Sequence, residues 1–141
     1  MALETPERLV DFWVNYSKFY NRLYNAIDNV IQQQYHLNLN EFYLLYHLSQ
    51  ADKFKLRLTD LQPKIGLSHS ALSRLVTRME NYQNKQLVWR SICEDDKRAS
   101  YITLTKEGSQ LFESISNVLN QTLDASLTKP DLDHIIRMVK G

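Results

Sequence analysis

The most restrictive feature of the sequence lies between residues 58 and 104, where two short segments of helical periodicity precede two alternating ones. Their apolar residues are Leu61 and Ile65 in the first, and Ala71, Leu72, Leu75, Val76 and Met79 in the second, over 69–82. Gly66-Leu67-Ser68 separates them and supplies a turn and a new N-cap. Residues 87–93 and 99–104 then alternate like the strands of a hairpin around a charged tip. This order predicts a winged helix-turn-helix.

Long helices are expected on both sides of this region. Residues 7–34 place apolar side chains alternately three and four positions apart, which predicts a helix with a coiled-coil-like seam. The seam consists of Leu9, Phe12, Tyr16, Phe19, Leu23, Ala26 and Val30, and a second row consists of Trp13, Tyr20, Tyr24, Ile27 and Ile31. Because this arc is wider than one contact surface requires, we expect the helix to meet both its own domain and a second subunit.

The predicted fold is mostly α with a small β-wing (α+β), in a single compact domain. A further helix is expected to open at Thr105, and its partner follows Pro130. We expect residues 1–36 and 105–141 to form a helical dimerisation region. Residues 37–104 form the winged helix-turn-helix lobe in this prediction.

Charge is distributed unevenly along the chain. Residues 53–106 contain eleven Lys or Arg and five Asp or Glu, a net charge of +6, whereas the whole 141-residue chain carries +1. The middle of the chain is therefore suited to face a polyanion, while the ends do something else.

Several classes of function are disfavoured by what the sequence lacks. The four His are scattered, no metal-ligand spacing occurs, and no paired-carboxylate, nucleophile-elbow or phosphate-loop signature is present. We expect neither catalysis nor a cofactor nor a metal. The single cysteine, Cys93, and the absence of a signal or membrane-spanning segment favour a cytoplasmic protein without membrane contact.

The N-terminal end of the 69–82 segment carries the side chains expected to meet DNA. This end of the second helix enters the major groove in helix-turn-helix proteins, and small polar side chains there permit close approach. The candidates are Ser68, His69, Ser70, Ser73, Arg74 and Arg78. Arg74 and Arg78 lie one turn apart and can reach phosphates, whereas Ser and His can bond phosphates or bases. The alternative is an ordinary solvated helix face with a Ser N-cap.

From about Leu37 to Gly108 the chain resembles the MarR family of bacterial winged-helix transcription regulators. The resemblance rests on LTDLQPKIGLSHSALSRLVTRME and on LVWRSICEDDKRASYITLTKEG. Its most specific part is the wing, where the family carries Asp-x-Arg and then Leu-Thr-x-x-Gly. Here these motifs are Asp96-Lys97-Arg98 and Leu104-Thr105-Lys106-Glu107-Gly108.

The resemblance implies roles for the wing tip. It implies that Arg98, with Lys97 beside it, is directed at the minor groove, whose negative potential suits a guanidinium. It also implies that Asp96 braces the wing through an ion pair. The alternative is that these charges only keep a hairpin tip soluble.

The segment between the second helix and the wing departs from the family pattern. Residues 81–86, Asn-Tyr-Gln-Asn-Lys-Gln, replace a shorter turn that usually contains Gly. Either the helix continues for nearly another turn, or a loop protrudes before the wing.

The family resemblance also implies a small-molecule effector. Members commonly bind aromatic or phenolic molecules between the dimerisation helices and the DNA-binding lobe, and Tyr provides an apolar wall with a hydroxyl group. The candidate pocket residues are Trp13, Tyr16, Tyr20, Tyr43 and Tyr46. Aromatic residues at helical spacing also commonly form core, which is the competing interpretation.

Taken together, these patterns predict a DNA-binding transcription regulator. The expected form is a homodimeric repressor on a pseudo-palindromic operator in double-stranded DNA, released by a small aromatic or phenolic effector. The alternative is a winged-helix protein-interaction module without DNA binding, although such modules tend to lack a basic stripe like the one in residues 53–106.

Overall fold

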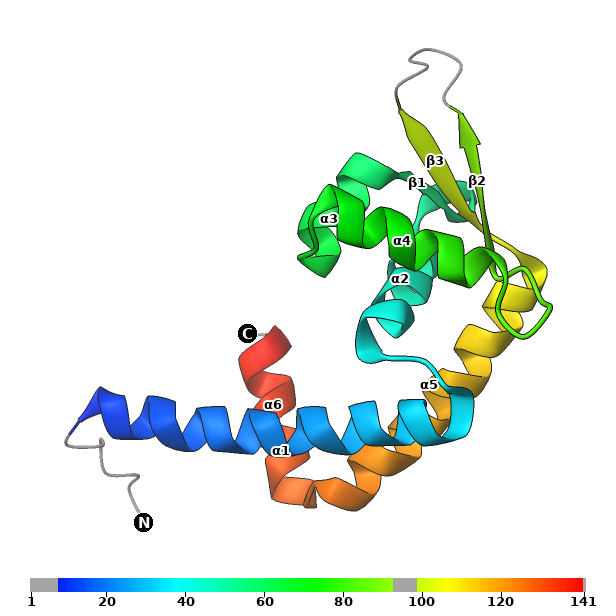
Figure 1. The fold of residues 1–141 in the computed structure, drawn as a ribbon. Coiled ribbons are helices and arrows are strands. Elements are labelled where there is room, and N and C mark those ends of the chain that lie inside the picture. The colour runs from blue at the N-terminus through cyan, green and yellow to red at the C-terminus, as the bar shows by residue number, and fades with distance from the viewer. Residues whose placement is uncertain (1–7, 93–98, 141) are drawn as a thin grey trace.

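The computed structural model describes residues 8–92 and 99–140, which form six α-helices and a three-stranded sheet (Figure 1). In chain order the elements are α1 (Leu9–Tyr35), α2 (Leu39–Gln50), the 3₁₀ turn η1 (Asp52–Phe54), β1 (Lys55–Arg57), α3 (Leu58–Ile65), α4 (His69–Glu80), β2 (Val88–Ile92), β3 (Ser100–Leu104), α5 (Lys106–Ser126) and α6 (Lys129–Lys140). The predicted fold class, mostly helical with a small β-wing, is confirmed.

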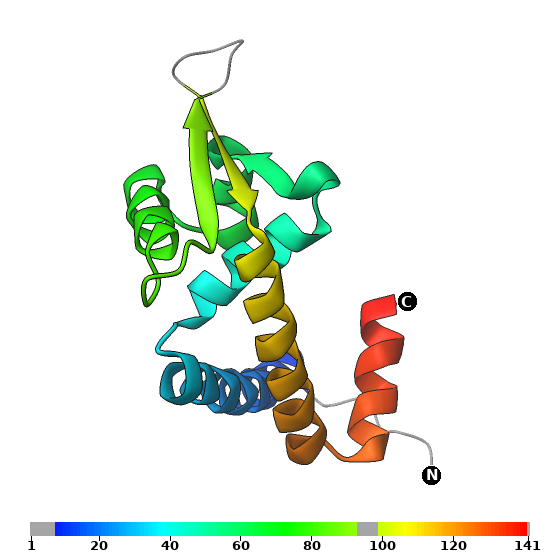
Figure 2. The same ribbon diagram turned by 90° about the vertical axis from the view of Figure 1, so that its right-hand side faces the viewer.

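The elements from α2 to β3 form a lobe on one side of the molecule, and α1 and α6 lie on the other (Figures 1 and 2). α5 connects the two sides, because it packs against α2 near the lobe and against α1 farther along. The core of the lobe is formed mainly by buried Leu side chains from α2, α3 and α4, together with the inner face of the sheet.

Local capping explains where α2 begins. Asn38 is its N-cap: the Asn38 side chain accepts a hydrogen bond from the Glu41 backbone N–H at 2.9 Å, and the Glu41 carboxylate accepts one from the Asn38 N–H at 3.0 Å. This reciprocal capping box satisfies two backbone donors that a helix start leaves open.

The sheet has the strand order β1-β3-β2, and all of its pairs are antiparallel. Its inner face is mainly apolar, because Val88, Ile102 and Leu104 are buried against the helices. Its outer face carries larger exposed or half-buried side chains such as Trp89 and Tyr101. The alternation predicted for a hairpin is therefore confirmed, and β1 adds a third strand on the other side of β3.

The start of α5 is joined tightly to the start of the wing. The Thr105 hydroxyl accepts from the Gly108 N–H at 2.9 Å and lies 2.9 Å from the Leu87 carbonyl, to which it can donate. A Cβ at Gly108 would lie 2.1 Å from that same carbonyl oxygen, so only glycine permits this approach. The Leu-Thr-x-x-Gly motif therefore holds the helix against the strand.

α1 is covered along only part of its length. Its second half meets α5 and contributes the buried Ile31, whereas its first half exposes large apolar side chains, among them Trp13 at 63%. The sequence predicted one helix with two contact surfaces around its circumference. In the structure the covered and the uncovered parts follow one another along the helix axis instead, because α5 crosses only the second half of α1.

Candidate nucleic-acid interface

The helix-turn-helix consists of α3 and α4 with Gly66 between them. Gly66 adopts a φ of +83°, a left-handed conformation that closes the end of α3 and favours glycine. Ser68 then caps α4, since its hydroxyl oxygen accepts from the Ala71 N–H at 3.2 Å. Ser68, His69 and Ser70 are all exposed. The structure thus presents the N-terminal end of α4 to solvent.

α4 buries one face and presents the other outward. Leu72, Leu75, Val76 and Met79 are fully or almost fully buried in the lobe. The exposed side chains of α4 are those of His69, Ser70, Arg74, Thr77 and Arg78. At 100° per residue, Ser70, Arg74 and Thr77 lie opposite the buried stripe, which makes them the residues best placed to face a groove. Thr77 was not among the residues predicted from the sequence.

One side of α4 is fixed to the wing by Arg90 of β2. The Arg90 guanidinium donates to the Ser73 hydroxyl at 3.0 Å and to the Ser73 carbonyl at 2.9 Å. Ser73 is therefore half-buried and already serves as an acceptor, although the sequence suggested it only as a DNA contact. Arg90 was missed as a site residue. It follows Val88 by two positions and so falls on the inner face of the hairpin, where a charged residue is unexpected.

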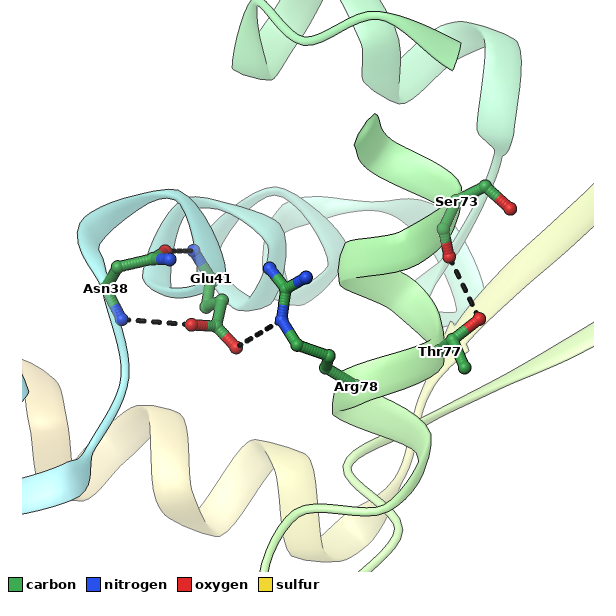
Figure 3. A network of polar contacts seen from close by, with 5 residues as sticks. All are labelled: Asn38, Glu41, Ser73, Thr77 and Arg78. Carbon is green, nitrogen blue, oxygen red and sulfur yellow. Dashed lines mark hydrogen bonds and ion pairs between the residues drawn. The ribbon is translucent and has the colours of Figure 1, made fainter. Parts of the chain in front are cut away.

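The other side of α4 approaches the beginning of α2. Arg78 lies 3.9 Å from the Glu41 carboxylate, measured from Nε to Oε2, and Figure 3 shows it reaching across to the capping box. The Arg78 side chain is 55% exposed, so this ion pair is screened by water and still leaves the guanidinium accessible. Thr77, in contrast, donates its hydroxyl to the Ser73 carbonyl at 3.1 Å within α4.

The residues at the wing tip lie outside the described part of the chain. Residues 93–98 include Asp96, Lys97 and Arg98, so their predicted roles stay predictions. The strands below the tip carry further cations. Lys55 Nζ lies 4.8 Å and Arg57 Cζ 5.6 Å from the centre of the Tyr101 ring, which places positive charge on the outer face of the sheet.

The predicted effector residues do not all lie together. Trp13, Tyr16 and Tyr20 line one groove on α1, of about 340 Å³. Burial raises the pKa of Tyr43 on α2, and the electrostatic influence of the neighbouring Tyr20 raises it further. Tyr46 faces elsewhere, with its ring centre 6.2 Å from that of Phe112 on α5.

Two other features of the described residues bear on function. Nowhere within 8–92 and 99–140 do three His, Cys, Asp or Glu side chains gather as metal ligands would. None of the described helices contains a stretch long and apolar enough to span a membrane.

The contact between Arg90 and Ser73 should be measurable as a coupling energy. Arg90→Met is expected to lower the free energy of unfolding by about 1.5–3 kcal/mol, because hydrogen bonds from a charged donor are lost. Ser73→Ala should cost less, since the backbone acceptor remains. Urea unfolding of both single variants and the double variant measures the coupling. Strictly additive effects would show that the two side chains do not interact.

Comparison of the sequence with known protein families identifies a family of transcriptional regulators. A family model described as "Transcriptional regulator SarA/Rot" matches residues 26–115, which is more than half of the chain. No curated protein matches the chain in sequence.

Solved structures share the fold over nearly the whole chain. AbsC, a MarR family transcriptional regulator from Streptomyces coelicolor, has a TM-score of 0.77 and 24% identity, over 99% of this chain and 94% of that one. A second MarR family regulator from Streptomyces coelicolor, solved in complex with DNA, has a TM-score of 0.72 and 25% identity, over 99% and 90%. NadR in complex with 4-hydroxyphenylacetate has a TM-score of 0.68 and 19% identity, over 99% and 96%.

The predicted resemblance to MarR regulators is thereby confirmed, and the match over residues 26–115 identifies the family more closely. The chain belongs to the SarA/Rot family of transcriptional regulators, a winged-helix family related to MarR.

Proposed function

We propose that this regulator binds double-stranded DNA as a homodimer and represses transcription by covering a pseudo-palindromic site. The observation that carries the proposal is the outward face of α4, where Ser70, Arg74 and Thr77 are exposed beside a capped N-terminus. A helix with this arrangement fits a major groove, and its small side chains allow its backbone to come close to base edges. The related regulator solved with DNA supports the choice of ligand.

The positive charge of the lobe supplies the non-specific part of the affinity. Arg74 and Arg78 are exposed on α4, and the predicted wing pair Lys97 and Arg98 would add two further cations. In this proposal the arginines of α4 contact phosphates, Arg98 enters the minor groove, and Asp96 supports it. Such a protein would act in the cytoplasm, where bacterial DNA lies.

A homodimer explains the uncovered half of α1. The exposed apolar side chains there are Leu9, Val10, Phe12, Trp13, Val14, Tyr16 and Tyr20, and α6 adds Ile136, Met138 and Val139. Single apolar side chains are common on the surface of a monomer, but this many on two neighbouring helices indicate an interaction surface. α1 and α6 also enclose a groove of about 420 Å³ lined by Phe12, Tyr16 and Met138, among others. The terminal helices of a second copy would cover this surface, which assigns 1–36 and 105–141 to dimerisation.

A small aromatic or phenolic effector is the third part of the proposal. The groove at Trp13, Tyr16 and Tyr20 has about the volume of a small-molecule site. Tyr43 does not line it, although Tyr20 raises the Tyr43 pKa. Tyr46 lies apart from it and is left out. NadR, which shares the fold, was solved with 4-hydroxyphenylacetate. Binding would release DNA only if the effector prefers one arrangement of the dimer.

Salt dependence of DNA binding distinguishes this function from a protein-interaction module. The logarithm of the affinity for duplex DNA should fall linearly with the logarithm of the salt concentration. Arg74→Ala and Arg98→Ala should each lower this slope by about one unit, because each removes about one phosphate contact or groove contact. Fluorescence anisotropy at several salt concentrations measures the slope, and Lys129→Ala on α6 is the control. Affinity that does not respond to salt, or slopes unchanged in both arginine variants, would contradict the assignment.

The dimer is tested by placing a charge in the exposed apolar surface of α1. Tyr16→Glu should abolish both dimerisation and specific DNA binding, since an unpaired carboxylate would be buried between the subunits. Sedimentation velocity gives the oligomeric state, and Lys18→Glu provides a control with a charge change at a polar position of the same helix. A Tyr16→Glu protein that stays dimeric with wild-type affinity would show that the interface lies elsewhere.

The effector site is tested with 4-hydroxyphenylacetate as the probe. Binding beside Trp13 should quench tryptophan fluorescence in the wild type and in Trp89→Phe, but not in Trp13→Phe. Quenching that disappears only with Trp89→Phe would move the site to the wing.

A further inference from the structure

Residues 81–86, which depart from the family pattern, form a closed turn. α4 ends at Glu80, two residues earlier than the sequence predicted, so the segment is a short loop and not an extension of the helix. The Tyr82 N–H donates to the Lys85 carbonyl at 2.8 Å, and the Lys85 N–H donates to the Tyr82 carbonyl at 2.7 Å. The two residues between them, Gln83 and Asn84, both have positive φ, +50° and +65°. This is the backbone pattern of a two-residue type I′ hairpin turn, built here without glycine.

The turn is anchored to α4 at both ends. The Asn81 N–H donates to the Arg78 carbonyl at 3.3 Å, and the Leu87 N–H donates to the Met79 carbonyl at 3.0 Å. These two bonds connect the turn to the last residues of the helix. Movement of the turn is therefore coupled to movement of the C-terminal end of α4.

The turn also reaches the dimerisation side of the molecule. The Tyr82 phenol donates to the backbone carbonyl of Tyr35 at 2.5 Å, and Tyr35 is the last residue of α1. A carbonyl at this position has no partner within its own helix, so the phenol satisfies an acceptor that would otherwise stay open. The Tyr35 hydroxyl in turn lies 2.7 Å from the Ser114 hydroxyl of α5. The end of α1, the middle of α5 and the turn after α4 thus meet at one junction.

The phenol is suited to act as a permanent donor. Burial raises the Tyr82 pKa above its ordinary value, and the neighbouring Tyr35 and Glu41 raise it further. A phenol is protonated at neutral pH even at its ordinary pKa, and the upward shift extends this to more alkaline pH. The nearby ion pair between Arg78 and Glu41 is weaker support for the angle of α4, because its atoms are 3.9 Å apart and Arg78 is more than half exposed.

We propose that Tyr82 is a positioning residue whose hydrogen bond to α1 sets the angle of the recognition helix relative to the dimerisation helices, and thereby the half-site spacing that the dimer accepts. The proposal rests on the DNA-binding homodimer proposed above. In a two-fold dimer the α4 helices must enter successive major grooves about 34 Å apart, so a change in the angle of each lobe changes the spacing that both can reach. Tyr82 contacts no DNA in this account and acts only through the orientation of α4.

The first experiment measures the orientation without DNA. Spin labels are placed at Asn29→Cys on α1 and Lys64→Cys on α3, both exposed positions, in a Cys93→Ser background. Doubly labelled protein is diluted into excess unlabelled protein, so that pulsed dipolar spectroscopy reports only distances within one protomer. Wild type should give one narrow distribution, which Tyr82→Phe should broaden or shift because the ring remains but the donor is lost. An unchanged distribution in Tyr82→Phe overturns the proposal.

Two matched variants separate the hydrogen bond from other effects. Tyr24→Phe removes a phenol hydroxyl of α1 that makes no hydrogen bond within residues 8–92 and 99–140, and it should leave the distribution narrow. Asn84→Gly replaces a residue at positive φ with the one that this turn position favours, so the junction should also stay narrow. Broadening in Tyr24→Phe equal to that in Tyr82→Phe would contradict a specific role for Tyr82.

The second experiment measures spacing preference on DNA. Affinities are compared for duplexes whose half-sites are separated by the preferred spacing and by one or two base pairs more or fewer. Tyr82→Phe should reduce the preference for the best spacing by about three- to tenfold, the scale of one hydrogen bond, while affinity for random duplex DNA stays unchanged. A spacing profile identical to wild type, despite a broadened distance distribution, overturns the link to specificity. If wild type itself shows no specific binding, the proposed function fails, and the spin-label distances still judge the Tyr82 contact.

Discussion

The backbone of Leu87 is the point on which the arrangement of the lobe depends. Its N–H donates to Met79 at the end of α4, and its carbonyl accepts from the Thr105 N–H at 3.0 Å where α5 begins. One residue therefore joins the recognition helix, the first wing strand and the long helix that leads to the dimerisation side. Gly108 is required at this point because any side chain there would displace the Leu87 carbonyl. These contacts join the end of α4 to the first wing strand, and the proposed simultaneous contact with two grooves would require such a connection.

Around this point, α4 is held on both flanks while its outward face stays free of the core. Arg90 fixes the flank that faces the wing, and the turn carrying Tyr82 fixes the end that faces α1. In the proposed complex with DNA, a helix supported in this way would lose little conformational freedom on binding, so less of the interaction energy would be needed to order it. The uncovered apolar half of α1 lies at the opposite side of the molecule. In the proposed dimer, the contact between subunits would be coupled to α4 through α5, through the direct contacts of α1 with α2, and through the junction at Tyr35.

The sequence was sufficient for the elements and the family, because both depend on local patterns. Alternation predicted β2 and β3, and Thr105 predicted the start of α5. It was insufficient where a contact depends on packing between distant segments. Arg90 reaches Ser73 across seventeen positions, and only the angle between β2 and α4 brings them together. The sequence left residues 81–86 open between a longer helix and a loop, because the positive-φ positions hold Gln83 and Asn84, which carry a weaker turn signal than Asn-Gly.

Selection of bound fragments from random duplex DNA tests the central claim most directly, namely that two copies of α4 read DNA as a symmetric pair. If they do, the enriched sequences will contain two inverted half-sites whose centres lie about one helical turn, 10–10.5 base pairs, or a multiple of it apart. Enrichment of a single unpaired half-site, or no enrichment above random sequence, would contradict it.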